Sequence, residues 1–71
     1  MNVKEMFKEL GYDQLISDDI IIYYKEEESI TFRLEEKIFY KVFYDTAGNI
    51  NMQELKAINK QIEELGWLKN D

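Results

Sequence analysis

Residues 20–44 predict strands with large apolar or aromatic side chains on both faces, and this feature constrains the fold most strongly. Residues 29–36 alternate as a half-buried strand does, with Ile30, Phe32 and Leu34 on one face and Thr31, Arg33 and Glu35 on the other. In residues 37–44, one face carries Ile38, Tyr40, Val42 and Tyr44, and the other carries Phe39, Lys41 and Phe43. Such a sheet must be covered on both sides, by helices, by a second copy or by a partner.

The length and composition of the chain indicate one small domain spanning residues 1–71. A chain of 71 residues lies near the lower size limit for a self-sufficient core. Cysteine and histidine are both absent, which excludes disulfides, thiolate zinc sites and imidazole metal sites. The apolar share of 45% and the aromatic share of 14% argue against disorder. We therefore expect a domain held together by packing, with self-association as an added source of stability.

The distribution of apolar residues predicts neither a signal peptide nor a membrane span. Residues 1–10 alternate charged with apolar side chains and lack the continuous apolar stretch of a signal peptide. The longest apolar run, residues 20–24, is far too short to cross a bilayer. We therefore expect a cytoplasmic protein without a membrane partner.

The start of the chain predicts a helix with clear signals at both of its ends. Asn2 is expected to cap this helix, with Glu5 in the capping-box position three residues later. Gly11 is expected to end the helix in the left-handed conformation. The helical spacing of apolar residues predicts one buried stripe, formed by Val3, Met6, Phe7 and Leu10.

The end of the chain predicts a second helix that repeats these signals. Asn51 is the expected cap, Glu54 its capping-box partner and Gly66 the residue that ends the helix. Tyr12 and Trp67 each follow a terminating glycine, and we expect them to fold back on their helices. The buried stripe of this second helix is predicted to be Leu55, Ile58, Ile62 and Leu65.

These elements predict an α+β fold in the order α-β-β-β-α: a three-stranded antiparallel β-meander flanked by N- and C-terminal helices. Residues 13–19 are expected to form a loop with a short extended piece at residues 15–16, and residues 45–49 a turn. The predicted core packs Phe7, Leu10, Leu55, Ile58, Ile62 and Leu65 on Ile30, Phe32, Leu34, Ile38 and Val42. The pattern leaves open which sheet face each helix covers, and also the register of residues 20–25, because both faces of that strand are apolar.

The sequence offers no catalytic, metal-binding or cofactor motif. Nucleophilic triads lack their histidine or cysteine, and the three glycines are isolated from one another, so they form no phosphate-binding loop. The paired acids at residues 18–19 and 35–36 are more simply explained as solvated turn residues than as a metal site. We therefore expect no catalytic residues, no metal and no cofactor, and a protein that is not an enzyme.

The far face of the sheet is the candidate binding surface. If Ile30, Phe32, Ile38 and Val42 face the helices, the opposite face exposes the candidate contact residues Tyr23, Arg33, Phe39, Lys41 and Phe43. One interpretation is that a helix covers each face and leaves nothing exposed. A second is that this face binds a protein, either a second copy in a homodimer or a foreign partner, because aromatic residues and arginine are typical interface anchors.

A third interpretation is single-stranded nucleic-acid binding on the same face, with bases stacked on the aromatics and phosphates held by Arg33 and Lys41. The net charge of −6 disfavours nucleic acid without eliminating it. The acidic turns at residues 18–19, 26–28 and 35–36 have two explanations as well. They protect the sheet edges and aid solubility, or they form a negative rim that imitates a phosphate backbone.

The whole chain resembles a group of small uncharacterised phage and prophage proteins from mobile elements of Gram-positive bacteria. The resemblance is carried by residues 3–12, VKEMFKELGY, and by residues 52–67, MQELKAINKQIEELGW, with a similar aromatic and acidic strand segment between them. It implies a compact α-β-β-β-α domain and assigns no catalytic or binding residues. Because mobile elements often encode small acidic inhibitors of host proteins, it also implies a non-enzymatic interaction module that inhibits or regulates a host protein.

Overall fold

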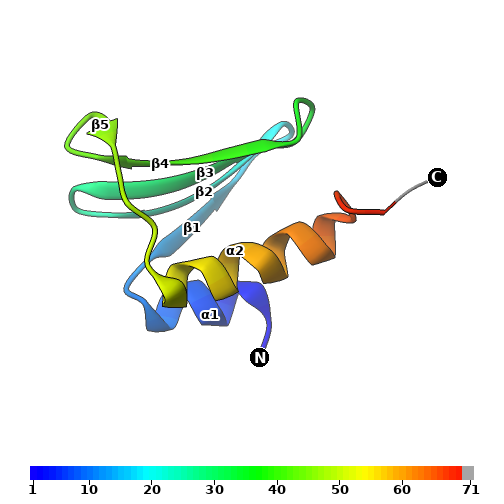
Figure 1. The fold of residues 1–71 in the computed structure, drawn as a ribbon, viewed down its shortest axis with the longest axis horizontal. Coiled ribbons are helices and arrows are strands. Elements are labelled where there is room, and N and C mark those ends of the chain that lie inside the picture. The colour runs from blue at the N-terminus through cyan, green and yellow to red at the C-terminus, as the bar shows by residue number, and fades with distance from the viewer. Residues whose placement is uncertain (70–71) are drawn as a thin grey trace.

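The computed structural model of the chain describes residues 1–69 as a five-stranded antiparallel sheet with two helices (Figure 1). The elements are α1 (Val3–Glu9), β1 (Asp13–Ile16), β2 (Ile20–Lys25), β3 (Glu28–Arg33), β4 (Ile38–Phe43), β5 (Thr46–Ala47) and α2 (Met52–Leu65). The strands follow one another in the order β1-β2-β3-β4-β5, so the sheet is a simple meander. Both helices lie on the same side of it, and the α+β class is confirmed.

The prediction of three strands is wrong, because two further short strands extend the sheet at its edges. β1 pairs with β2 from Asp13 opposite Tyr24 to Ile16 opposite Ile21. β5 has two residues and pairs with the end of β4. Strands this short are stabilised by the neighbour on which they pair, and a single-sequence pattern does not carry that information.

The local signals at the helix ends are confirmed. Asn2 and Glu5 form a reciprocal capping box on α1, and Asn51 and Glu54 form one on α2. Gly66 ends α2 at φ 72°, in the left-handed region that favours glycine. After α1, the ring of Tyr12 turns back and meets the ring of Phe7 edge-on, with 5.8 Å between the ring centroids.

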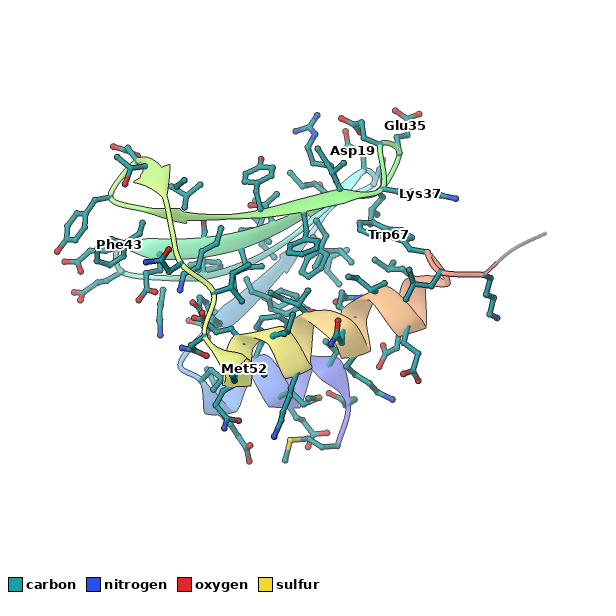
Figure 2. The ribbon with its side chains drawn as sticks, in the orientation of Figure 1. Asp19, Glu35, Lys37, Phe43, Met52 and Trp67 are labelled. Carbon is teal, nitrogen blue, oxygen red and sulfur yellow. The ribbon has the colours of Figure 1, made fainter. Side chains whose placement is uncertain are left out.

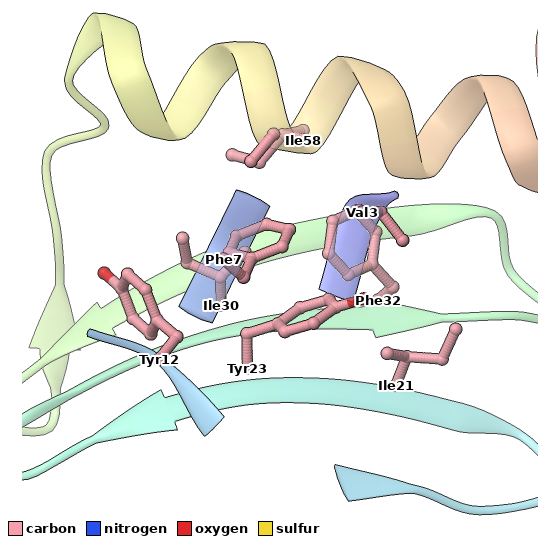
Figure 3. Close-up of a cluster of buried hydrophobic side chains, with 9 residues drawn as sticks. Val3, Phe7, Tyr12, Ile21, Tyr23, Ile30, Phe32 and Ile58 are labelled. Carbon is pink, nitrogen blue, oxygen red and sulfur yellow. The ribbon is translucent and has the colours of Figure 1, made fainter. Parts of the chain in front are cut away.

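The core lies between the sheet and the helices and centres on Phe7 (Figure 3). The ring of Phe7 stacks on the ring of Tyr23 with 3.8 Å between centroids, and it meets the ring of Phe32 edge-on at 6.5 Å. Ile58 of α2 closes this cluster from the opposite side and is fully buried. Aromatic pairs of this kind add about 0.5–1.5 kcal/mol each beyond the burial of their area.

The predicted core is correct for much of the helices and β3 but wrong for β4. Phe7, Ile58, Ile30 and Phe32 are buried as predicted, whereas Ile38 is 48% exposed. Buried residues that the pattern did not identify are Tyr12, Tyr23, Ala57 and Gln61. The buried positions of α2 are Glu54, Ala57, Ile58 and Gln61, a stripe rotated from the predicted one because polar side chains occupy half of it.

Candidate interaction surface

The outer face of the sheet, opposite the helices, is defined by the register of the strands. Ile21, Tyr23, Ile30 and Phe32 are buried beneath the helices, and side chains alternate between the two faces of a strand. Their sequence neighbours therefore point away from the core. On β1–β4, the outer face is formed by Asp13, Leu15, Ile20, Ile22, Tyr24, Ser29, Thr31, Arg33, Ile38, Tyr40 and Val42.

A central row of the outer face crosses four strands. Leu15, Ile22, Thr31 and Tyr40 lie directly opposite one another in the register of β1, β2, β3 and β4. Thr31 is buried although it points away from the core, because the bulkier Ile22 and Tyr40 flank it on both sides. The large side chains of this face remain open to solvent, with exposed fractions of 40% to 55% for Leu15, Tyr24, Ile38 and Tyr40.

Acidic turns lie at both ends of the outer face. At one end the turns between β1 and β2 and between β3 and β4 carry Asp18, Asp19, Glu35 and Glu36; at the other end the turns carry Glu26, Glu27 and Asp45. Figure 2 shows Asp19 and Glu35 together at the first end. Residues 13–47 contain nine acids and four bases, whereas the rest of the chain contains six acids and five bases. Most of the net charge of −6 therefore belongs to the sheet and its turns.

The five predicted contact residues do not share a face, so the premise that grouped them is wrong. Tyr23 is fully buried in the core, and Phe39 packs beside Phe32 on the helix side with 5.8 Å between the ring centroids. Lys41 also lies on the helix side, and its side chain is 6% exposed. Phe43 is half-exposed at the end of the sheet, on the inner face (Figure 2). Arg33 alone lies on the outer face, where it pairs with Glu36 at 2.7 Å.

The error comes from the length of the β3–β4 connection. Arg33 pairs with Ile38 across a four-residue turn, and an even number of turn residues places odd-numbered residues of one strand beside even-numbered residues of the other. Ile30 and Phe32 therefore share their face with Lys41 and Phe39. A change of one residue in the register exchanges the two faces completely.

Lys41 is held in a buried polar network at the start of α2. Its Nζ donates to Oε1 and Oε2 of Glu54 at 2.8 and 2.9 Å, and it lies 2.9 Å from Oε1 of Glu28. The hydroxyl of Tyr12 donates to Oε2 of Glu54 at 2.6 Å. The backbone N–H of Asn51 donates to Oε1 of the same carboxylate at 3.1 Å. Glu54 thus serves as a helix-cap residue and as the acceptor that joins α2 to the sheet.

The network lowers the pKa of Glu54 and raises the pKa values of Lys41 and Tyr12. Burial by itself raises the pKa of Glu54, but hydrogen bonds from Lys41 and Tyr12 outweigh it, so the pKa lies below its ordinary value. Burial lowers the pKa of Lys41, but the carboxylates of Glu54 and Glu28 reverse this and hold it above its ordinary value. Burial and the hydrogen bond to Glu54 together raise the pKa of Tyr12 far above its ordinary range. Lys41 and Glu54 are therefore an ion pair across the physiological pH range.

The buried polar groups of this network are satisfied within the domain. Among residues 1–69, every buried side-chain nitrogen and oxygen has a hydrogen-bond partner. The described residues also contain no cluster of three acidic side chains able to hold a metal ion. No helix in the described part of the chain has the length and apolar character needed to cross a membrane. The inner polar groups are therefore paired with one another within the domain, whereas neither helix covers the outer face.

The main residues of the outer face were not among the predicted contact residues. No recognisable motif includes Leu15, Tyr24, Ile38 or Tyr40, and the sequence pattern assigned Ile38 to the core. The turn lengths carried the missing signal, because a two-residue turn between β2 and β3 and a four-residue turn between β3 and β4 determine which side chains lie together. None of the family models, curated proteins or solved structures compared with this chain matches it.

Proposed function

We propose that this chain is a non-enzymatic protein-interaction module whose contact surface is the outer face of the sheet. The observation that carries this proposal is the central row, in which Leu15, Ile22, Thr31 and Tyr40 follow one another across four strands on a face that neither helix covers. The largest exposed apolar patch of a small protein is often a functional one. The resemblance to mobile-element proteins supports a role as an acidic inhibitor or regulator of a host protein.

Single-stranded nucleic-acid binding is the weaker alternative, because the placement of basic side chains does not favour it. Lys41 is committed to Glu54 and Glu28, and Lys25 donates to the backbone carbonyl of Leu10 at 3.1 Å. Arg33 and Lys37 are the remaining bases of the sheet segment, beside a surplus of carboxylates. A surface with this balance repels phosphates more than it attracts them.

The test is affinity capture from a bacterial lysate with an outer-face variant and a matched control. The variant Leu15→Ser with Tyr40→Ser removes apolar surface at the two ends of the central row. The control Met52→Ser with Leu68→Ser removes exposed apolar side chains at α2 and directly after it. Met52 lies on the helix side of the domain (Figure 2), and Leu68 lies beside Asn59 and Glu63 of α2. We expect the outer-face variant to lose a protein that the wild type and the control capture equally well, with or without nuclease.

Both variants must first show the wild-type circular dichroism spectrum and unfolding midpoint, so that a loss of capture reflects the surface. Equal capture by all three proteins would contradict the proposal. Recovery of nucleic acid that depends on Tyr40 and disappears after nuclease treatment would favour the alternative.

A further inference from the structure

We propose that the outer face binds a basic amphipathic helix of a partner protein, which lies across the central row and places lysine or arginine side chains over the acidic turns. This inference depends on the proposed function, since it names the chemistry of the partner at the same surface. It follows from three observations: the size of the face, its charge, and the way the inner face is already covered.

The length of the face matches the length of a short helix. β2, β3 and β4 have six residues each and β1 has four. At about 3.3 Å per residue the longer strands make the face about 20 Å long, and four strands about 4.8 Å apart make it about 19 Å wide. A helix of about 13 residues is about 20 Å long and matches the length of the face.

The inner face shows that this sheet accepts a helix of that length. α2 has 14 residues, lies along the inner face and contributes Ala57 and Ile58 to the core beneath it. The sheet is therefore covered by helices on one side and open on the other (Figure 1). A helix on the outer face would add a third layer to the two layers of this domain.

The charge of the face determines which helix fits it. The turns at both ends are acidic, and the two lysines of the strands, Lys25 and Lys41, are turned inward to Leu10 and Glu54. Two copies meeting through this face would bring their acidic turns together, so the charge opposes a homodimer. A partner with an apolar stripe flanked by lysine and arginine would contact the central row and neutralise the turns at the same time.

The experiment selects binders from a displayed library of 16-residue helical peptides whose composition at the randomised positions is unbiased. Peptides are selected on the wild-type protein and then depleted on the Leu15→Ser, Tyr40→Ser variant, so that the survivors depend on the outer face. We expect the survivors to combine an apolar stripe with a net positive charge. Their affinity should weaken as the NaCl concentration rises from 50 to 300 mM, because exposed charges are screened.

Two double variants with reversed charges then test which acidic side chains attract the positive charge of the peptide. Glu26→Lys with Glu35→Lys reverses one acidic side chain at each end of the outer face, and Glu9→Lys with Glu64→Lys makes the same change of net charge on the helices. We expect the first pair to weaken a selected peptide by about fivefold or more, from the usual strength of exposed ion pairs, and the second to change its affinity by less than about twofold.

The outcomes separate this inference from the function on which it depends. Survivors that are neutral or acidic, or that bind both charge variants equally, would overturn the basic partner and leave the outer face as a protein-binding surface. If every selected peptide binds the wild type and the Leu15→Ser, Tyr40→Ser variant equally well, both the basic partner and the outer-face binding surface are overturned. A wild-type dimer in sedimentation velocity that dissociates in the Tyr40→Ser variant would instead identify a second copy as the occupant and overturn the inference.

Discussion

Replacing Lys41 by methionine tests the arrangement of the two faces directly. Methionine keeps most of the apolar stem, which packs beside Gly48, and removes the ammonium group with its charge and its hydrogen bonds to Glu54. In the structure, this change leaves the carboxylate of Glu54 buried at 3% exposure without its cation. Breaking a buried ion pair by removing one partner costs about 3–5 kcal/mol.

We expect Lys41→Met to lower the free energy of unfolding by about 3 kcal/mol, near the lower end of this range. The hydroxyl of Tyr12 and the N–H of Asn51 still donate to Glu54 and reduce the loss. A domain of 71 residues has a total unfolding free energy of about 4–10 kcal/mol. The melting temperature should therefore fall by about 12–24 °C, at about 4–8 °C for each kcal/mol. Thermal and urea unfolding, followed by circular dichroism and by the fluorescence of Trp67, measure this loss.

Two further variants decide how the result is interpreted. Arg33→Met removes a charge that lies on the outer face and should cost only about 0.5 kcal/mol. Adding Glu54→Gln to Lys41→Met removes the stranded charge while keeping a capping-box residue, so it should recover at least about 1 kcal/mol. Equal losses for Lys41→Met and Arg33→Met would place Lys41 in solvent and refute the assignment of both faces.

Two other predictions follow from the same geometry. The lowered pKa of Glu54 contributes stability that is complete above its ordinary value near 4.5 and is lost as the pH falls through the lower folded value. The urea concentration at the unfolding midpoint should therefore decrease in the wild type as the pH is lowered from 6 to 2, and it should decrease less steeply in Glu54→Gln. Phe39→Ser should lower the free energy of unfolding by about 2 kcal/mol, because the ring packs on Phe32. Phe43→Ser, at the exposed end of β4, should lower it by less than half as much. Similar losses for the two variants in urea unfolding would contradict this difference.

The features that could be predicted from the sequence are local ones. A cap such as Asn2 or Asn51 and its partner three residues later interact within a single turn of helix, so their residue types and spacing suffice. The left-handed residue at Gly66 is determined in the same way. The ring of Tyr12 packs against the ring of Phe7 for a related reason, because the chain reverses its direction between these two residues.

The features that could not be predicted depend on register and on distant partners. Phe39 and Tyr40 are both aromatic, and only the length of the turn decides which of them faces the helices. The position of Lys41 depends in addition on Glu54, which lies on another element and is itself buried. A sequence pattern treats both as solvated charges, because it contains no information about their pairing.

The inward placement of Lys41 also explains why the two faces of the sheet differ in character. The inner face contains polar groups with fixed partners, such as Lys41 with Glu54 and Tyr23 with Gln61, and these fix the position of α2. On the outer face, Thr31 lies at the centre, and Arg33 at the end of β3 is partly exposed and paired with Glu36. Among the described residues of this face, no buried charge therefore dictates the position of a covering element. Turning Lys41 inward joins α2 to the sheet and at the same time leaves the outer face without this positive charge. The same side chain therefore links the stability of the domain to the acidic surface that we propose a basic partner recognises.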